Sequence, residues 1–434
     1  MKAVVHKIAE NILAIYFIAL GVMMHYFVED MTYIGGIGIS FRHIFALVIV
    51  FSTAIIFLVK PNISRGIVSL KSALVMSAPI VVMLTASLLI WAVNLTETDM
   101  MMRGVSLYFI FINNTTAAFA GICFLYLFGK KGMWYYMASI LIANLALIGQ
   151  IMLEGGVVTY MIEYVIKVLS FAGDSRDVVG KAEIHELSFC TGISFLYMLF
   201  VFDRKKLLHW ILLILSFFCF TSAIKRIAVL GIGVAIVLWW IFSLIKKRTS
   251  HKTVMKLIAI LNILMIIFLI LYVGIIKSGL FEVLENAGLE TSGRAKIYNS
   301  VDGYYEFSPS YFGKGMGWLP YQLSEVVDIG VKSVHNDFLQ FYIDLGFWGY
   351  IIWLFSFISL RTSFFGRDGD TSSGILMFLV IVFMVVVSLT DNTMNYPLFN
   401  GAVAIFVTGY SFEEKVRADE MKRFSYISEE NRER

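Results

Sequence analysis

Charge is the property that this sequence has least of. Asp, Glu, Lys and Arg make up 15% of its 434 residues, whereas hydrophobic residues make up 59%. A soluble chain carries about 25% charged residues, so the deficit places this protein in the membrane class. The net charge of +4 adds little information, and we expect no nucleic-acid partner.

Cysteine and proline are also scarce, with 3 and 5 residues. Cys123, Cys190 and Cys219 all fall in apolar runs, which indicates buried thiols without disulfide or metal-ligand spacing. Asp368-Gly369-Asp370 resembles the Asp-x-Asp metal site of nucleotide-sugar transferases. It lies in a short loop with no nucleotide-binding domain attached, so we interpret it as a turn. We therefore expect neither a metal nor a cofactor.

Long apolar runs fill most of the chain. A helix needs about 20 apolar residues to cross the bilayer core, and about twelve runs approach that length. The sequence therefore predicts an all-α fold, a polytopic bundle of about twelve transmembrane helices. The predicted spans are residues 10–28, 43–59, 73–94, 105–128, 134–153, 187–202, 207–223, 226–245, 257–276, 344–361, 374–390 and 398–412.

Basic residues cluster in every second short loop, as at Lys130–Lys131, Arg204–Lys206 and Lys246–Arg248. Because basic loops stay in the cytoplasm, both termini are predicted to be cytoplasmic. The first apolar run lacks a cleavage site and is interpreted as a retained span. The predicted organisation is spans one to nine in residues 1–276, a large extracytoplasmic loop in 277–343, spans ten to twelve in 344–412 and a cytoplasmic tail in 413–434.

A first long outer segment follows the fifth span. Within residues 157–171, the polar residues Thr159, Glu163, Lys167 and Ser170 step by four, four and three, which forms one stripe on an otherwise apolar helix. This pattern is typical of a helix that lies in the outer leaflet. The alternative is a thirteenth span, which would bury Glu163 and Lys167 and reverse the charge rule for half of the chain.

Cations at two outer positions are candidates for binding an anion. The hairpin Thr221–Arg226 places Lys225 and Arg226 at the membrane edge, where a guanidinium suits a lipid-linked phosphate. The alternative is a pair of snorkelling side chains. Arg294 follows Ser292-Gly293 at a predicted helix start, a geometry that attracts phosphate; the alternative is a solvated loop arginine.

His335 is the candidate general base. Ser333 or Asn336 is predicted to cap a helix over residues 337–345, which Gly346 ends. A neutral imidazole at that helix start could take a proton from a hydroxyl, with Asn336 beside it as a substrate-binding residue. The alternative is a histidine that only helps to cap the helix.

Other outer residues are weaker candidates. Glu183, His185 and Glu186 precede the sixth span and could form an acid/base or sugar-binding cluster. Trp318 and Tyr396 could stack on sugar rings. Trp318 follows Gly313-Lys314-Gly315-Met316-Gly317, which we interpret as a flexible turn.

These motifs, in this order around one large outer loop, resemble the bacterial O-antigen polymerase and O-antigen ligase superfamily over roughly residues 180–390. The residues that carry the resemblance are His335-Asn336-x-x-Leu339-Gln340 with Gly346 and Gly349, Ser292-Gly293-Arg294, Gly313-x-Gly315-x-Gly317 and the basic hairpin that ends at Arg226.

The resemblance implies a metal-independent glycosyl transfer at the outer face of the bacterial inner membrane. Undecaprenyl-diphosphate-linked glycans would be donor and acceptor, with a flippase and a chain-length regulator as further candidate partners. Family reasoning places Arg226 and Arg294 on the diphosphate and His335 near the attacking hydroxyl. The family often has Ser directly before the hairpin Arg, whereas Ile224-Lys225 stand there in this chain, so the choice between Lys225 and Arg226 stays open.

Polymerisation of lipid-linked repeat units is the function that we expect. The nearest alternative is an O-antigen ligase, which transfers the finished glycan to a lipid A core and uses the same motifs. An alternative from another class is a flippase for lipid-linked sugars, which should carry ionisable residues deep within its helices and related halves. A non-enzymatic membrane scaffold is the remaining alternative.

Overall fold

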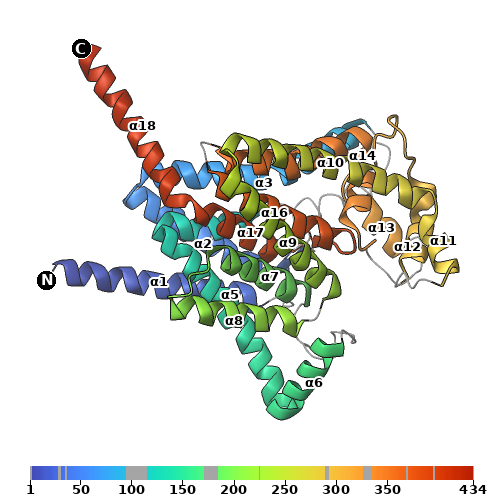
Figure 1. Cartoon of the computed structure of the whole chain (residues 1–434), viewed down its shortest axis with the longest axis horizontal. Helices are drawn as coiled ribbons and strands as arrows, with labels where there is room; N and C mark the ends of the chain where they lie inside the picture. Colours follow the sequence, from blue (N-terminus) through green and yellow to red (C-terminus); the bar gives the residue numbers. More distant parts are fainter. Residues whose placement is uncertain are drawn as a thin grey trace. The chain divides into compact units, whose positions relative to one another are not determined.

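The structure is a computed structural model, and it is almost entirely helical (Figure 1). This confirms the all-α fold class. Within the described ranges the exception is a two-stranded hairpin, β1 (Met31–Ile34) and β2 (Ile37–Ser40), paired antiparallel with Ile34 opposite Ile37. The described residues are 2–27, 31–34, 37–93, 115–170, 184–223, 225–288, 293–325, 334–367, 370–393 and 396–433.

Among the described residues, eight helical segments are long and apolar enough to cross a membrane. They are Lys7–Tyr26 within α1 (Lys2–Tyr26), α2 (Phe41–Val59), α3 (Ile63–Val93), α5 (Lys130–Gly155), α9 (Arg226–Arg248), α10 (His251–Lys277), Asp337–Phe365 and α16 (Thr371–Ser388). The segment Asp337–Phe365 joins α14 (Asp337–Leu354), a π-helical stretch (Phe355–Leu360) and α15 (Arg361–Phe365).

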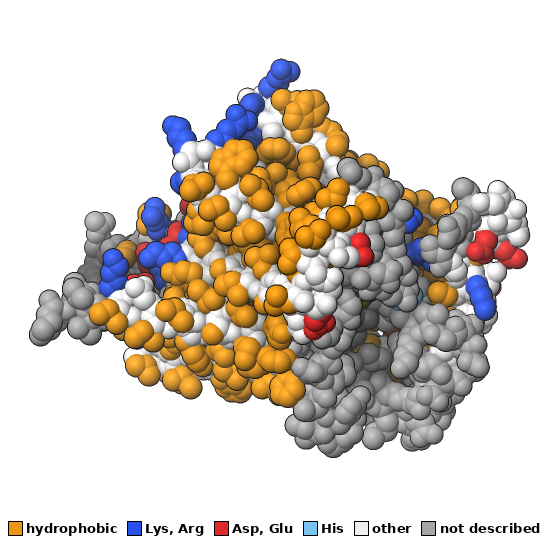
Figure 2. Space-filling view, turned by 90° about the horizontal axis from the view of Figure 1, so that it is seen from below, with side chains coloured by type: hydrophobic (Ala, Val, Ile, Leu, Met, Phe, Trp, Pro, Cys, Tyr) orange, Lys and Arg blue, Asp and Glu red, His pale blue; other side chains and the backbone are white. Residues whose placement is uncertain are grey.

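Four shorter apolar helices match the remaining predicted spans. These are Thr115–Phe128, α7 (Ile184–Val201), α8 (Leu207–Ser222) and α17 (Pro397–Tyr410). In their described residues, the predicted spans therefore overlap apolar helices, as expected of a multi-pass membrane protein, whereas residues 105–114 of the fourth span lie outside the description. In Figure 2, hydrophobic side chains cover much of the surface drawn in colour, and most of the visible Lys and Arg side chains lie toward its edges.

The chain divides into two compact units. The first comprises residues 1–76, 114–233 and 396–434, and the second comprises residues 77–113 and 234–395. Lys225 and Arg226 belong to the first unit, whereas Arg294 and His335 belong to the second. Each unit is described by itself below.

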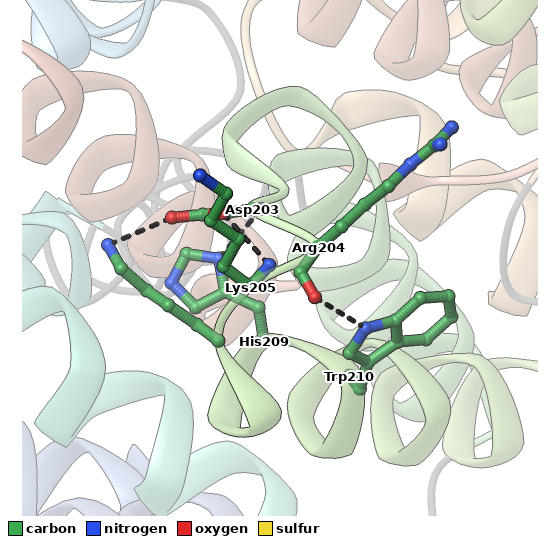
Figure 3. A network of polar contacts seen from close by, with 6 residues as sticks. Asp203, Arg204, Lys205, His209 and Trp210 are labelled. Atoms are coloured by element: carbon green, nitrogen blue, oxygen red, sulfur yellow. Dashed lines mark hydrogen bonds and ion pairs between the residues drawn. The ribbon is translucent and has the colours of Figure 1, made fainter.

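The antiparallel pair α7 and α8 forms part of the core of the first unit, and Tyr197 of α7 stacks on Phe406 of α17 at 5.2 Å between ring centroids. A tight polar turn joins the pair (Figure 3). The Asp203 amide donates to His209 Nδ1 at 3.1 Å, and the Asp203 carboxylate accepts from the Lys205 amide at 3.0 Å. That amide is the main reason why the pKa of Asp203 is lowered. The hairpin with Lys225 lies at the other end of α8, about 24 Å away at 1.5 Å per residue.

Glycines position the outer elements of the second unit. Gly346 has φ 70° and interrupts the helical conformation inside α14, as the sequence predicts, but the helix resumes at once. The Gly315 amide donates to the Asp344 carbonyl at 2.8 Å, and a Cβ on Gly313 would lie 2.4 Å from the Gly346 nitrogen. The segment 313–317, expected to be a flexible turn, is thus packed directly against α14, because backbone meets backbone there.

The remaining elements are short or polar. The outer part of the second unit contains α11 (Leu280–Asn286), α12 (Arg294–Val301), a 3₁₀ turn (Asp302–Tyr304) and α13 (Trp318–Glu325). In the first unit, α6 (Val157–Ser170) follows α5 after Gly156. The charged tail forms α18 (Phe412–Glu433), whose Glu413 accepts from the Lys130 amide at 3.0 Å.

Candidate active site around Arg294 and His335

Arg294 opens α12 and is half-buried. Gly293 precedes it with φ 76°, a left-handed conformation that suits glycine and turns the chain into the helix. The Nη2 atom of Arg294 donates to the Thr390 carbonyl at 3.2 Å. Ser292, which precedes the predicted helix start, lies outside the described residues. The guanidinium is therefore fixed by the segment between α16 and α17, at a helix N-terminus that favours anions.

His335 is exposed and adopts φ 49°, which among the described non-glycine residues is the only positive φ. The helix cap is Asn336, whose Oδ1 accepts from the Leu339 amide at 3.1 Å. Asn336 therefore caps α14, as predicted, and the other predicted cap, Ser333, lies outside the described residues. The choice between a general base and a residue that helps to cap the helix therefore stays a prediction for His335. Left-handed non-glycine residues are typical of functional sites.

Asn336 is held on every side. It is fully buried, and its Nδ2 donates to the hydroxyls of Tyr272 at 3.1 Å and Tyr298 at 3.0 Å. Its backbone amide donates to Asn392 Oδ1 at 3.0 Å. A buried amide with all of these bonds made has one stable orientation. The hydrogen bonds of Asn336 therefore also fix the backbone of the adjacent residue, His335.

The segment 389–393 contacts both parts of the site. Its Thr390 carbonyl accepts from Arg294, and its Asn392 side chain accepts from Asn336. The Asp391 carbonyl also accepts from the Asp337 amide at 3.3 Å, and Thr393 donates to the Asp337 carboxylate at 2.9 Å. One short segment thus joins the first turn of α12 to the N-terminus of α14. Arg294 and the residue next to His335 are bound two residues apart on it.

Tyr298 links the same two elements a second time. It lies one helical turn after Arg294 on α12, is 3% exposed, and accepts from Asn336. Burial raises the pKa of Tyr298, and the Asn336 bond and Arg294 oppose that rise. The hydroxyl is therefore neutral at physiological pH and keeps its proton. Two helix N-termini and a guanidinium converge here, an arrangement that favours a bound anion over water.

Sequence reasoning missed several residues of this site. Tyr298 could have been found from its spacing of four from Arg294, which places both on one face of a helix. Tyr272 lies in an apolar run with no local signal. Asn392 and Thr393 lie in no motif of the sequence. Their roles depend on contacts between distant parts of the chain.

The predicted hairpin cations lie in the first unit. Arg226 is the first residue of α9 and is exposed. Lys225 is half-buried, with Nζ 5.5 Å from the centroid of the Phe189 ring. Tyr396 also packs on Phe189, at 5.9 Å between ring centroids. The first unit therefore gathers Lys225 and Tyr396 on one aromatic ring, and the meeting of Arg226 with Arg294 and His335 stays a prediction.

The remaining predicted residues are placed as follows. Trp318 begins α13, packs edge-on against Tyr304 at 5.1 Å and has Lys314 Nζ 5.4 Å from its ring. His185 and Glu186 lie in the first turn of α7, where side chains are outside the description, and Glu183 precedes the described residues.

No group of three or more His, Cys, Asp or Glu residues with metal-binding geometry occurs among the described residues. Asp370 accepts from the Ser373 amide at 3.0 Å and so caps α16, as expected of a turn. Cys123, Cys190 and Cys219 are free thiols, and the last two are buried. Asp368 lies outside the described part of the chain, and the expected absence of a metal stays a prediction.

Comparison with known families identifies the region that contains these residues. The family model described as O-antigen ligase matches residues 210–354. That range includes the hairpin with Lys225 and Arg226, the helix that Arg294 opens, and the His335-Asn336 turn. No curated protein matches the chain. Residues 210–354 are therefore similar to the O-antigen ligase family, and this match supports the O-antigen ligase and polymerase superfamily, whose members are glycosyl-transferring enzymes.

Proposed function

We propose that this protein polymerises oligosaccharide repeat units carried on undecaprenyl diphosphate, at the outer face of the bacterial inner membrane. The observation that supports it most is the joint attachment of Arg294 and Asn336 to residues 390–392. That attachment holds the Arg294 guanidinium and the residue next to His335 to one short segment. Both termini are cytoplasmic in this proposal, and the loop between α10 and α14 faces the periplasm.

The proposed step is a direct displacement at the anomeric carbon. A hydroxyl of the acceptor glycan attacks, and His335 takes the hydroxyl proton. The bond between the anomeric carbon and the diphosphate oxygen breaks, and the electron pair leaves with undecaprenyl diphosphate. Arg294 stabilises the charge that grows on this leaving group, with Arg226 or Lys225 as a second cation. His335 then releases its proton to water.

This chemistry needs no metal ion in the proposal, because arginines supply the positive charge. Trp318 and Tyr396 are proposed to contact sugar rings, and His185 and Glu186 to contact polar groups of the glycan. Trp318 and Tyr396 each pack against one aromatic ring and are half-buried. Part of each side chain is therefore accessible to a sugar.

A ligase is the second candidate, and the family model that matches is itself described as O-antigen ligase. The two functions differ in the acceptor, which is a second lipid-linked glycan for a polymerase and a lipid A core for a ligase. The glycan profile of a deletion strain separates them. Single capped repeats on the core would support the polymerase, and long chains that remain unattached would contradict it.

A further inference from the structure

The helix α6 differs from the spans beside it. Gly156, with φ 88°, ends α5 and starts α6 in a new direction. At 1.5 Å per residue, the 26 residues of α5 extend about 39 Å and the 14 residues of α6 about 21 Å. The hydrocarbon core is about 30 Å thick, so α5 crosses it and α6 is too short to do so.

The surface of α6 has three faces. Tyr160, Tyr164 and Val168 are the only described residues of α6 that are buried or half-buried, and they follow one another at intervals of four. Thr159 and Glu163 form an exposed polar face. The third face is apolar and exposed, and includes Val158 at 71%, Ile162 at 55%, Val165 at 47% and Ile166 at 59%.

The buried face attaches α6 to the end of α8. The hydroxyl groups of Tyr164 and Thr221 are 2.7 Å apart, and the Tyr164 ring packs against Phe218 at 5.2 Å between centroids. Tyr160 is 4% exposed. Thr221 precedes Lys225 by four residues in the sequence. The helix is therefore anchored beside the cationic hairpin.

We propose that α6 lies in the plane of the outer leaflet, with its apolar face against lipid acyl chains and Glu163 at the headgroups. The exposed apolar side chains of α8, such as Ile214 and Phe217, continue this surface from the helix on which α6 packs. A perpendicular helix would place Glu163, the middle of the segment, in hydrocarbon. A helix that lies flat keeps the carboxylate in water and the valines and isoleucines in lipid.

The position of α6 sets the depth of the hairpin. Because Tyr160 and Tyr164 fix the last turn of α8, lipid contact along α6 holds Lys225 and Arg226 at the level of the headgroups. This inference does not depend on the reaction proposed above, since it concerns only the contact between protein and lipid.

The test measures depth, with single spin labels in phosphatidylcholine nanodiscs. Cysteines replace Val158, Ile162 and Val165 on the apolar face and Thr159 and Glu163 on the polar face. Cys190 and Cys219 are buried, so the unsubstituted chain serves as the labelling blank. Labels at Ile142 and Leu153 of α5, which are 47% and 85% exposed, provide a matched crossing helix.

We expect the three apolar-face labels to be accessible to oxygen and to lie at one common depth. The polar-face labels should instead be accessible to a water-soluble nickel complex. The α5 labels should differ in depth by about 16 Å along the helix. A steady change in depth from residue 158 to residue 165 would show a crossing helix and overturn the proposal. Apolar-face labels that are accessible only to the nickel complex, or to neither reagent, would overturn the proposal as well.

A second arm tests the link to the hairpin. The double variant Val158→Asn/Ile162→Asn removes lipid contact, and a label at Leu230 of α9, which is 57% exposed, reports hairpin depth. We expect the Leu230 label to become shallower by several Å, and Thr159→Asn, on the polar face, to leave it unchanged. An unchanged Leu230 label in the double variant would contradict the anchoring role.

Discussion

His335 has a backbone conformation that costs free energy. Its φ of 49° lies in the left-handed region, where a non-glycine residue costs about 1–3 kcal/mol. The bonds of the adjacent Asn336 to Asn392, Tyr272 and Tyr298 maintain this conformation. A strained residue with an exposed side chain is typical of a functional site.

The variant His335→Asn separates the imidazole from the turn. Asn tolerates the left-handed region better than most residues, so the thermal unfolding temperature should stay within a few degrees of the parent. Glycan polymer should fall by about 10²-fold or more, because the proposed base is missing. Near-normal polymer on a gel, with normal expression, would show that the imidazole is not the base.

Tyr298 is predicted to position the site through its hydroxyl. Tyr298→Phe leaves one Asn336 N–H without its acceptor inside the protein, which costs about 1–3 kcal/mol, and polymer should become shorter. Tyr305→Phe is the matched control, because the buried Tyr305 hydroxyl has no hydrogen-bond partner among the described residues. Equal polymer length in both variants, with the unfolding temperature as a second readout, would contradict this role.

Buried and half-buried tyrosines between α10 and α14 make the stability of the protein depend on pH in the alkaline range. Burial raises the pKa of Tyr298, Tyr305 and Tyr311 above the ordinary value of 10.0. The unfolded chain ionises first, so their contribution is present below about pH 10 and is lost as pH rises further. The unfolding temperature should fall between pH 9.5 and about 11, and fall less steeply in Tyr305→Phe. Identical slopes for the two proteins would refute the assignment.

At the scale of elements, the spans and the cap were predictable and the connecting segment was not. Apolar runs locate the transmembrane helices because lipid selects for length and hydrophobicity. Asn336 and Gly346 mark the start and the break of α14, since caps and left-handed turns have local signatures. The segment 389–393 has no such signature. Its importance comes from partners at positions 272, 294 and 336, which only the folded chain brings together.

The glycine contacts between segment 313–317 and α14 give a prediction about how these two elements pack. Gly313→Ala puts a methyl group 2.4 Å from the Gly346 nitrogen at φ 88°, so the free energy of unfolding should fall by more than about 2 kcal/mol. Gly303→Ala is the control, because its added methyl would meet nothing within 4 Å. Thermal unfolding of both variants in detergent checks this. Equal stability would mean that the segment is the flexible turn expected from the sequence.

At the scale of the whole molecule, the charge pattern predicts one topology. The loops near Lys131, Lys205, Lys252 and Arg367 are all predicted to be cytoplasmic. Single cysteines there should resist a membrane-impermeant reagent in intact cells and react after permeabilisation. Ready labelling of any two in intact cells would overturn the arrangement of twelve spans with cytoplasmic termini.

The measurement that tests the central claim most directly uses purified protein in liposomes with lipid-linked repeat units and excess chelator. The parent protein should produce a ladder of glycan lengths, and Arg294→Ala should reduce its rate by about 10²–10³-fold. Arg294→Lys should restore little, because the planar fork is lost, whereas Lys296→Ala, an exposed cation on the same helix, should match the parent. A full ladder from Arg294→Ala, or a parent ladder that requires added Mg²⁺, would contradict the account.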